Sequence, residues 1–461
     1  MTSVPLPRLM LSAARSGAGK TTVTCAVLQA LKNRGVAVSS YKCGPDYIDP
    51  MFHTTVLGLP ARNLDPFFTD ENTTRFLLGR HANFCDVAII EGVMGHYDGI
   101  AGTTTQASAY ALSKMMDAST VLIADCKGTS VSIAAELLGF LHFRPDAKIQ
   151  GVLLNRISPM LYPSLKLMLE RELDIRVLGY LPPMPDCSLE SRHLGLITAS
   201  EVKNLREKLH RLAEQAERTI DLDGLLQLAA EAPPLSYTAP ALPTVTAHPT
   251  IAVARDCAFC FTYADNLDLL RSLGANLIEF SPLNDETLPA EADGLLLSGG
   301  YPELYAEALS ANKSMRASIR TALHCSLPCI AECGGFLYLH RTLQTKDGHT
   351  YPMVGALDTD AHDTGRLCRF GYIALTAEQD TLLCSQGEQI RAHEFHYYDS
   401  TDNGAAFTAK KPVRGTEWPC IHAQANLFAG YPHLYFYANP AFAERFVQQC
   451  AQYHQRKKQS R

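Results

Sequence analysis

Apolar stretches of strand length alternate with helical patterns along the first half of the chain. The apolar runs cover residues 9–13, 36–41, 87–91, 120–125 and 149–155, and helical patterns lie between them, beginning with residues 21–33. Strands that are apolar on both faces and alternate with helices are typical of a parallel sheet covered on both sides. The pattern predicts an α/β domain built on a mainly parallel sheet.

The same pattern starts again after a proline-rich break. Residues 232–249 contain five prolines, which exclude a helix or a central strand there. New apolar runs follow at residues 250–254, 276–280, 294–298 and 329–332. We therefore expect a first domain over residues 1–231, an extended linker over 232–249 and a second α/β domain over 250–450. The polar and basic residues 452–461 are predicted to be a frayed, solvated end.

Composition and charge exclude several classes of protein. Hydrophobic residues make up 46% of the chain and charged residues 19%, which indicates a globular protein, and the net charge of -6 provides no basic field for nucleic acid. No apolar run approaches the ~20 residues of a membrane helix, and the first residues do not resemble a signal peptide. With 14 scattered cysteines, the chain suits the reducing cytoplasm.

A phosphate-binding loop follows the first predicted strand. Residues 14–21 read ARSGAGKT and match the Walker A pattern G-x-x-x-x-G-K-S/T, except that Ala14 replaces the first glycine. A small-residue loop that runs into a helix N-terminus presents backbone N–H groups to a phosphate, although a simple glycine-rich turn is the alternative. We expect ATP to contact Ser16, Gly17, Gly19, Lys20, Thr21 and Thr22.

Three acidic segments lie at predicted strand ends or loops, where α/β sheets place their ligands. They are residues 42–53 (KCGPDYIDPMFH), 62–65 (RNLD) and 91–99 (EGVMGHYDG). Asp46 and Asp49 lie three residues apart on a loop stiffened by prolines, so they are candidates for binding magnesium or steering a substrate. Turn formation and helix capping, which Asp, Gly and Pro also serve, are the alternative.

The second half of the chain carries a candidate nucleophile. Residues 328–335 read PCIAECGG, in which an apolar strand runs into Cys333 and two glycines open the next helix. This is the pattern of a nucleophile elbow, and a helix N-terminus there is expected to lower the thiol pKa. Residues 298–303 (SGGYPE) also follow a strand, and their N–H groups are candidates for an oxyanion hole at Gly299, Gly300 and Tyr301.

Several long motifs in the same order resemble one family. KCGPDYIDP, EGVMGHYDG, LLNR, ESRHLGL (residues 190–196), SGGYPE and AECGG resemble segments of the corrinoid a,c-diamide synthases, whose first domain resembles dethiobiotin synthetase. The resemblance covers nearly the whole chain. It implies a P-loop, ATP-dependent amidoligase domain followed by a class I glutamine amidotransferase domain, with ATP and Mg²⁺ as cofactors and L-glutamine as the ammonia donor.

The resemblance also implies roles for single residues in the first domain. Thr21, Glu91 and Asp46 are expected to bind Mg²⁺, and Asn155 to recognise the adenine base. His96 stands where the family commonly carries an apolar residue. The reacting carboxylate and the nucleotide are expected to meet Asp46, Asp49 and Asp98, with Tyr47 and Ile48 as substrate contacts.

In the second domain the resemblance implies that Cys333 is the nucleophile and that His433 is its base. Related triad amidotransferases carry His-x-Glu, whereas here the second residue after His433 is Tyr435, so a Cys–His dyad and a carboxylate from elsewhere both stay open. For His393 and His396, in RAHEFHYY, we expect a structural or interdomain role.

The implied substrate is a corrinoid, amidated at its a and c acetate side chains during cobalamin biosynthesis. Nickel-sirohydrochlorin and hydrogenobyrinic acid are alternatives with the same chemistry, and a homodimer is left open. A ParA-like nucleotide switch with a vestigial amidotransferase domain is the alternative of another class. Retention of Cys333, His433 and SGGYPE argues against that switch.

Overall fold

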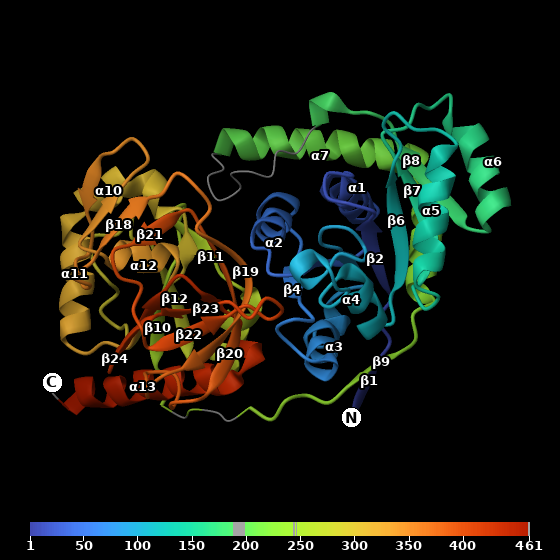
Figure 1. Cartoon of the computed structure of the whole chain (residues 1–461). Coiled ribbons are helices and arrows are strands. Elements are labelled where there is room, and N and C mark those ends of the chain that lie inside the picture. The colour runs from blue at the N-terminus through green and yellow to red at the C-terminus, as the bar shows by residue number, and fades with distance from the viewer. Residues whose placement is uncertain (188–198, 243–244, 246, 460–461) are drawn as a thin grey trace. The chain divides into compact units, whose positions relative to one another are not determined.

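The structure is a computed structural model that describes residues 1–187, 199–242, 245 and 247–459. The chain forms two compact units, Met1–Pro240 and Ala241–Arg461. In Figure 1 the first unit runs from blue to green and the second from yellow to red. Among the described helices, none combines the length and the apolar character that crossing a bilayer requires.

The first unit is built on a seven-stranded, fully parallel sheet, as the sequence predicted. The strand order is β4-β3-β5-β2-β6-β7-β8, with β2 in the centre. The bounds are β2 (Arg8–Ala13), β3 (Val38–Cys43), β4 (Ala61–Leu64), β5 (Val87–Glu91), β6 (Ser119–Asp125), β7 (Ile149–Asn155) and β8 (Arg176–Leu181).

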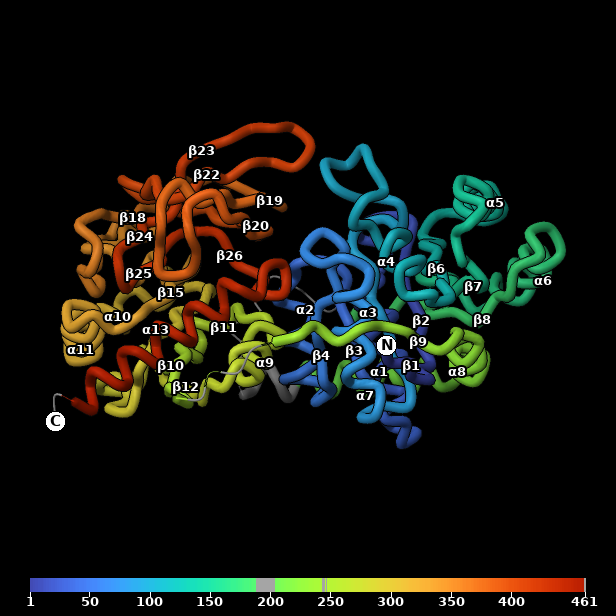
Figure 2. Tube along the Cα trace, turned by 90° about the horizontal axis from the view of Figure 1, so that it is seen from below, coloured from blue at the N-terminus to red at the C-terminus, as the bar shows by residue number. Residues whose placement is uncertain are grey.

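Helices cover both faces of this sheet. Because successive residues of a strand point to opposite sides, neighbouring residues pack against different helices. In β6, Val121 and Ile123 pack with α1 (Lys20–Asn33), α7 (Ala199–Thr219) and α8 (Leu222–Ala230). Leu122 and Ala124 instead pack with α5 (Ser132–Phe143) and α6 (Tyr162–Leu173). Figure 2 shows α5 on one side of β6 and α1 and α7 on the other.

Four shorter helices lie among the loops of this unit. They are α2 (Ile48–Phe52), which continues into the π-helix η1 (His53–Leu57), and further along the chain α3 (Glu71–Gly79) and α4 (Ala109–Met115).

The segment expected to be an extended linker is partly a strand of the first unit. Strand β9 (Leu235–Tyr237) pairs antiparallel with β1 (Thr2–Val4). The Tyr237 ring lies 5.8 Å from the ring of Phe76 on α3. A short edge strand tolerates neighbouring prolines, because its outer N–H groups need no ladder partner. The prediction of a linker starting at residue 232 was therefore wrong for these residues, and the units divide after Pro240.

The second unit contains a six-stranded sheet in the order β12-β10-β13-β15-β25-β24, parallel except for β24. The bounds are β10 (Thr250–Ala254), β12 (Asn276–Phe280), β13 (Gly294–Leu297), β15 (Cys329–Glu332), β24 (His422–Gln424) and β25 (Leu427–Gly430). Its helices include α9 (Ala264–Ser272), α10 (Ala306–Ala311), α11 (Lys313–His324), α12 (Gly334–Leu339) and α13 (Pro440–Gln459).

The unit also contains a larger antiparallel sheet and a smaller mixed sheet, in which β16 and β18 pair parallel. The larger has the order β23-β22-β19-β20-β26 and the smaller β17-β16-β18-β21. Their bounds are β16 (Thr342–Gln344), β17 (Thr350–Pro352), β18 (Asp360–Asp363), β19 (Arg369–Ala377), β20 (Gln389–His396), β21 (Tyr398–Ser400), β22 (Phe407–Lys410), β23 (Glu417–Cys420) and β26 (His433–Leu434).

The prediction of a frayed C-terminal end was wrong for residues 452–459, which are helical. Helix α13 continues to Gln459, and its residues Phe446 and Cys450 are fully buried. Beyond them the His454 Nδ1 atom lies 2.8 Å from the Asp293 Oδ2 atom, and Lys457 donates to the carbonyl of Ala290 at 2.8 Å. These contacts fasten the last turns of the helix, which the polar composition alone did not reveal.

We predict that His454→Ala destabilises the second unit. Asp293 is 1% exposed, and removing a partner of a buried carboxylate costs about 1–3 kcal/mol. A urea unfolding curve monitored by circular dichroism would show a lower midpoint than for the unaltered protein. The control is His349→Ala, because His349 is exposed and pairs only with the exposed Asp347. Equal midpoints for both variants would contradict the prediction.

Candidate nucleotide and amidotransferase sites

The phosphate loop joins β2 to α1 through a glycine that no other residue can replace without strain. Gly19, just before α1, has a φ of 90°, in the left-handed region. A Cβ atom added there would also lie 2.1 Å from the Asn155 Nδ2 atom at the end of β7. Asn155 itself donates to the carbonyl of Ala18 at 2.8 Å. The loop is thereby held against β7.

Lys20 is folded over this loop. Its Nζ atom donates to the carbonyls of Arg15, at 3.4 Å, and of Met94 in the EGVMG segment. Burial and the nearby charge of Lys42 lower the pKa of Lys20 to about 8. An anion bound in the loop would restore a favourable environment for this ammonium group.

Four side chains form a buried network beside the loop. Thr21 Oγ1 donates to Glu91 Oε1 at 2.9 Å, and Lys42 Nζ donates to the same oxygen at 2.8 Å. Lys42 Nζ also lies 2.5 Å from Asp49 Oδ2. Glu91 is fully buried, and burial raises its pKa to about 7. The structure thus brings together the predicted residues Thr21, Glu91 and Asp49.

Lys42 was not predicted as a site residue. The signal was present in the sequence, because a lysine at the end of an apolar strand needs a buried partner. The partner became visible only with the strand register, which places Lys42 of β3 directly beside Glu91 of β5.

Glu91 offers an oxygen for a cation. Its Oε2 atom is buried and has no hydrogen-bond partner among the described residues. Thr21 Oγ1 contacts Glu91, and Lys42 Nζ links Glu91 to Asp49, so hydroxyl and carboxylate oxygens of the kind that suits Mg²⁺ lie close together. The donor set present therefore fits this ion.

Asp46 and Asp98 have local roles in their loops. Asp46 Oδ1 accepts from the N–H groups of Ile48, at 2.8 Å, and Asp49, at 3.4 Å, which starts α2. Asp98 Oδ2 accepts from the N–H of Gly95 at 2.9 Å. The contact with the Lys42–Glu91 network is made by Asp49 rather than by Asp46. Asp46 Oδ1 therefore acts as a helix cap, which is the alternative role that the sequence left open. Tyr47 and Ile48, the predicted substrate contacts, lie half-buried at the start of α2.

A cavity of about 430 Å³ adjoins the phosphate loop. Gly19, Thr22 and Asn155 form its polar end, and Arg156 is fixed beside them by a 2.9 Å bond to the Gly17 carbonyl. The other wall is largely apolar and consists of Leu181, Pro182, Pro183, Met184, Pro185, Cys187 and Leu212. A flat apolar slot with a polar end suits a nucleotide base. The ESRHLGL motif, residues 190–196, lies outside the described residues.

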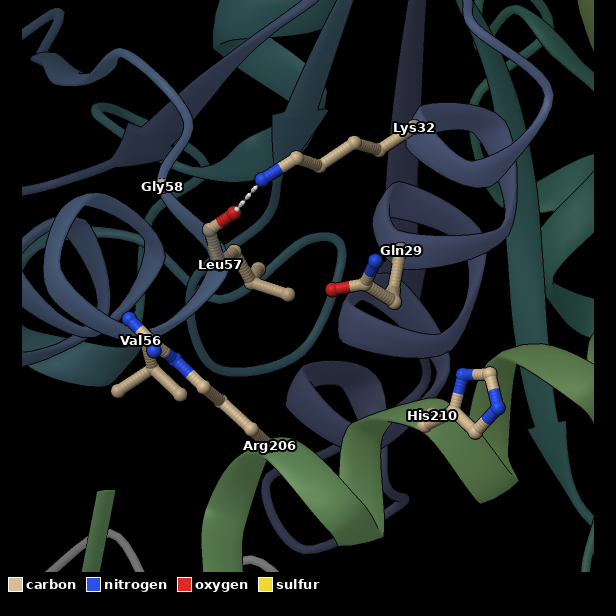
Figure 3. Close-up of a pocket in the computed structure, with 7 residues that line it drawn as sticks. All are labelled: Gln29, Lys32, Val56, Leu57, Gly58, Arg206 and His210. Carbon is tan, nitrogen blue, oxygen red and sulfur yellow. Dashed lines mark hydrogen bonds between the residues drawn. The ribbon is translucent and has the colours of Figure 1, made fainter. Parts of the chain in front are cut away.

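A smaller cavity, of about 270 Å³, lies at the other end of α1 (Figure 3). Gln29 and Lys32 of α1 face the end of η1 there, and Arg206 and His210 extend from α7. The Lys32 ammonium donates to the carbonyl of Leu57, which satisfies the end of η1. We therefore interpret this cavity as a gap at the contact between η1 and α1, where the Lys32 bond joins the two helices, and not as part of the nucleotide site.

In the second unit, Cys333 occupies a strained turn between β15 and α12. Its φ of 46° and ψ of -100° are rarely adopted by a non-glycine residue, as expected for a nucleophile elbow. Neighbouring strands hold this turn on two sides. The Cys333 N–H donates to the Gly430 carbonyl at 2.8 Å, and a Cβ atom on Gly335 would lie 2.2 Å from the Leu297 carbonyl oxygen.

The expected low pKa of the Cys333 thiol is not found. Burial, followed by the negative charge of Glu303, raises the pKa of Cys333 well above its usual value, and the N–H of Gly334 only partly opposes them. Helix α12 has six residues, and its N-terminus does not outweigh the burial. A thiol in this environment needs a base to take its proton.

His433 supplies a neutral imidazole next to this turn. Burial and the neighbouring His393 and His396 lower its pKa to about 3. A Cβ atom on Gly299 would lie 2.4 Å from its Cε1 atom, so the ring packs directly on the SGGYPE loop. Glu332, which sequence analysis did not single out, lies with its Oε2 atom 3.9 Å from His433 Nδ1.

The oxyanion prediction needs one correction. Gly299 and Gly300 form β14, which pairs with β11 (Phe259–Phe261), and the Tyr301 N–H donates to the Ala258 carbonyl at 2.9 Å. That N–H is therefore not available to an oxyanion. The Gly300 nitrogen lies close to Gly334, the residue after Cys333. A Cβ atom added to Gly334 would lie 2.9 Å from that nitrogen.

The two histidines of the RAHEFHYY segment, His393 and His396, have structural partners. His396 Nε2 lies 3.0 Å from Glu394 Oε1, and its ring stacks on Tyr431 with centroids 3.7 Å apart. His393 pairs with His433 between β20 and β26. These contacts support a structural role that also shapes the surroundings of His433.

We predict that Gly19→Ala weakens nucleotide binding at least ~10-fold, because the new methyl group both strains the backbone and collides with Asn155. Calorimetric titration with ATP and Mg²⁺ measures the change. Gly128→Ala is the matched control, since Gly128 also has a positive φ, of 71°, but no atom within 4 Å of an added Cβ. Equal affinity of the two variants would contradict the assignment of the loop.

Comparison with known proteins gives the same two-part organisation. Residues 9–197 match the CobQ/CobB/MinD/ParA nucleotide binding domain, and residues 250–441 match the CobB/CobQ-like glutamine amidotransferase domain. A cobyrinate a,c-diamide synthase of Listeria innocua is 40% identical, covering 94% of this chain and 97% of its own length. Those of Salmonella typhimurium and Caldanaerobacter subterraneus are 39% and 36% identical, covering 95% and 96% of this chain and 97% and 98% of their own. The chain therefore belongs to the cobyrinate a,c-diamide synthase family.

Proposed function

We propose that this protein uses ATP and glutamine to convert the a and c acetate carboxylates of cobyrinic acid into amides. One observation carries the proposal: a phosphate loop whose Thr21 donates to the buried Glu91, and an elbow cysteine with a neutral histidine packed on the SGGYPE loop, occur in one chain. The relatives named for this reaction match nearly the whole chain. We infer a cytoplasmic location from the proposed biosynthetic step.

The second unit releases ammonia from glutamine. His433 takes the proton of the Cys333 thiol, and the sulfur attacks the side-chain amide carbon of glutamine. The N–H groups of Gly300 and Gly334 stabilise the oxyanion that forms. The carbon–nitrogen bond then breaks, His433 returns its proton to the departing ammonia, and a thioester is left. Water, deprotonated by His433, hydrolyses the thioester to glutamate and regenerates the thiol.

The first unit activates the carboxylate that receives this ammonia. Lys20 and the loop N–H groups bind the phosphates, and the slot beside Asn155 holds the base. Thr21, Glu91 and Asp49 would hold Mg²⁺, which would supply positive charge to offset that of the phosphates. Transfer of the terminal phosphoryl group to a substrate carboxylate gives an acyl phosphate, and ammonia displaces phosphate to form the amide.

The decisive experiment supplies cobyrinic acid, ATP, Mg²⁺ and glutamine and follows the product masses by mass spectrometry. Two successive acid-to-amide conversions are expected. Cys333→Ala should abolish synthesis with glutamine and retain it with added ammonia, because only the nucleophile is lost. Cys325→Ala is the matched control, since Cys325 is exposed at the end of α11.

The other outcomes separate the alternatives. Glutamine hydrolysis without amidation of cobyrinic acid would keep the amidotransferase and transfer the test to nickel-sirohydrochlorin and hydrogenobyrinic acid. Absence of glutamine hydrolysis, with nucleotide binding intact, would contradict the enzyme and favour a ParA-like nucleotide switch.

A further inference from the structure

Glu332 is fixed between the nucleophile and the strand that carries the base. It is the last residue of β15, directly before Cys333, and is 7% exposed. Its Oε1 atom accepts a 3.0 Å hydrogen bond from the N–H of Leu434, the residue after His433. Its Oε2 atom lies 3.9 Å from His433 Nδ1. One oxygen therefore anchors the side chain while the other faces the imidazole.

Two other acidic side chains of the second unit, Glu394 and Asp265, are engaged by other residues. Glu394 lies 3.0 Å from His396 Nε2 and 3.8 Å from Arg369 Nε. At the position where related triad enzymes carry their glutamate stands Tyr435, whose hydroxyl donates to Asp265 at 3.1 Å. The position two residues after His433 thus carries no carboxylate, whereas Glu332 at the end of β15 places one 3.9 Å from His433 Nδ1.

We propose that Glu332 is the positioning residue of the glutaminase site. Its carboxylate orients the His433 ring so that Nδ1–H faces Glu332 and Nε2 faces Cys333, and it stabilises the imidazolium that forms when His433 takes the thiol proton. The proposal rests on the proposed function of this unit. The 3.9 Å separation is longer than a hydrogen bond, and we expect it to shorten when glutamine binds, because catalytic hydrogen bonds tighten in the substrate complex.

The surroundings explain why His433 needs this partner. His393 and His396 disfavour a charged His433, as does burial. Burial likewise raises the pKa of Glu332 to about 8, against the opposing N–H of Leu434. Each group alone is thus held neutral, whereas a carboxylate beside an imidazolium stabilises both charges.

These shifts give a pH signature. A carboxyl group with a raised pKa becomes negative only as the pH increases through that value. Glutaminase activity should therefore rise with pH through about 8 in the wild-type protein. Other ionisable groups around Cys333 and His433 include Glu303, Glu394, His393 and His396, and Glu332→Gln leaves all of them in place.

The test compares glutamine hydrolysis by the full-length wild type, Glu332→Gln and Glu332→Asp. Glutamine keeps the size of the side chain and an oxygen for the Leu434 N–H, but it cannot carry the negative charge. We expect kcat to fall ~10–100-fold with KM for glutamine little changed, since a positioned acid–base partner contributes about that much or more. The rise through pH 8 should disappear in Glu332→Gln and be partly retained in Glu332→Asp.

Ammonia-dependent amidation and a matched variant serve as controls. Both Glu332 variants should make amide from added ammonia at the wild-type rate, and Glu307→Gln, on the exposed side of α10, should leave glutamine hydrolysis unchanged. A wild-type kcat and pH profile in Glu332→Gln would overturn the proposal and leave a Cys–His dyad. Equal loss of glutamine- and ammonia-dependent synthesis would overturn it as well, by showing a structural role. Absence of glutaminase in the wild type would instead refute the proposed function.

Discussion

The parallel register of β3 and β5 places Lys42 beside Glu91, and the chemistry of the first unit depends on that pair. A fully buried glutamate is unfavourable unless a cation and hydrogen-bond donors surround it. Lys42 and Thr21 provide them from the strand end and from the first turn of α1. Because Thr21 follows the phosphate loop, the same contacts that stabilise the buried charge also fix the loop next to Glu91 and Lys42. Stability and nucleotide binding therefore share one network.

In the second unit, the arrangement around Cys333 depends on backbone geometry instead of on a buried charge. Cys333 can hold its strained conformation only because glycines on both neighbouring segments admit the turn, with Gly335 against Leu297 and Gly299 beneath His433. A larger side chain at these positions would displace the segments that carry Cys333 and His433. The arrangement of these two residues thus depends on neighbouring positions that have no side chain.

The sequence predicted the parts of the structure that depend on local pattern. Buried strands, the phosphate loop and the elbow at Cys333 follow from apolar runs and from small residues at strand ends, and all appear where expected. What the sequence could not supply was pairing between distant segments. The bond of Lys42 to Glu91, the engagement of the Tyr301 N–H by Ala258 and the short strand β9 each depend on a partner that is far away or in a different element.

The electrostatic states of the two units differ for a physical reason. In the first unit an ion pair is already formed around Glu91, so an anionic nucleotide and its cation enter a site that is charged in advance. In the second unit Cys333, His433 and Glu332 are all held neutral by burial. A thiolate is therefore costly until glutamine provides the amide carbon for it to attack. A resting nucleophile kept as a thiol is protected from reactions with other electrophiles, and the charge that catalysis requires develops only within the complete site.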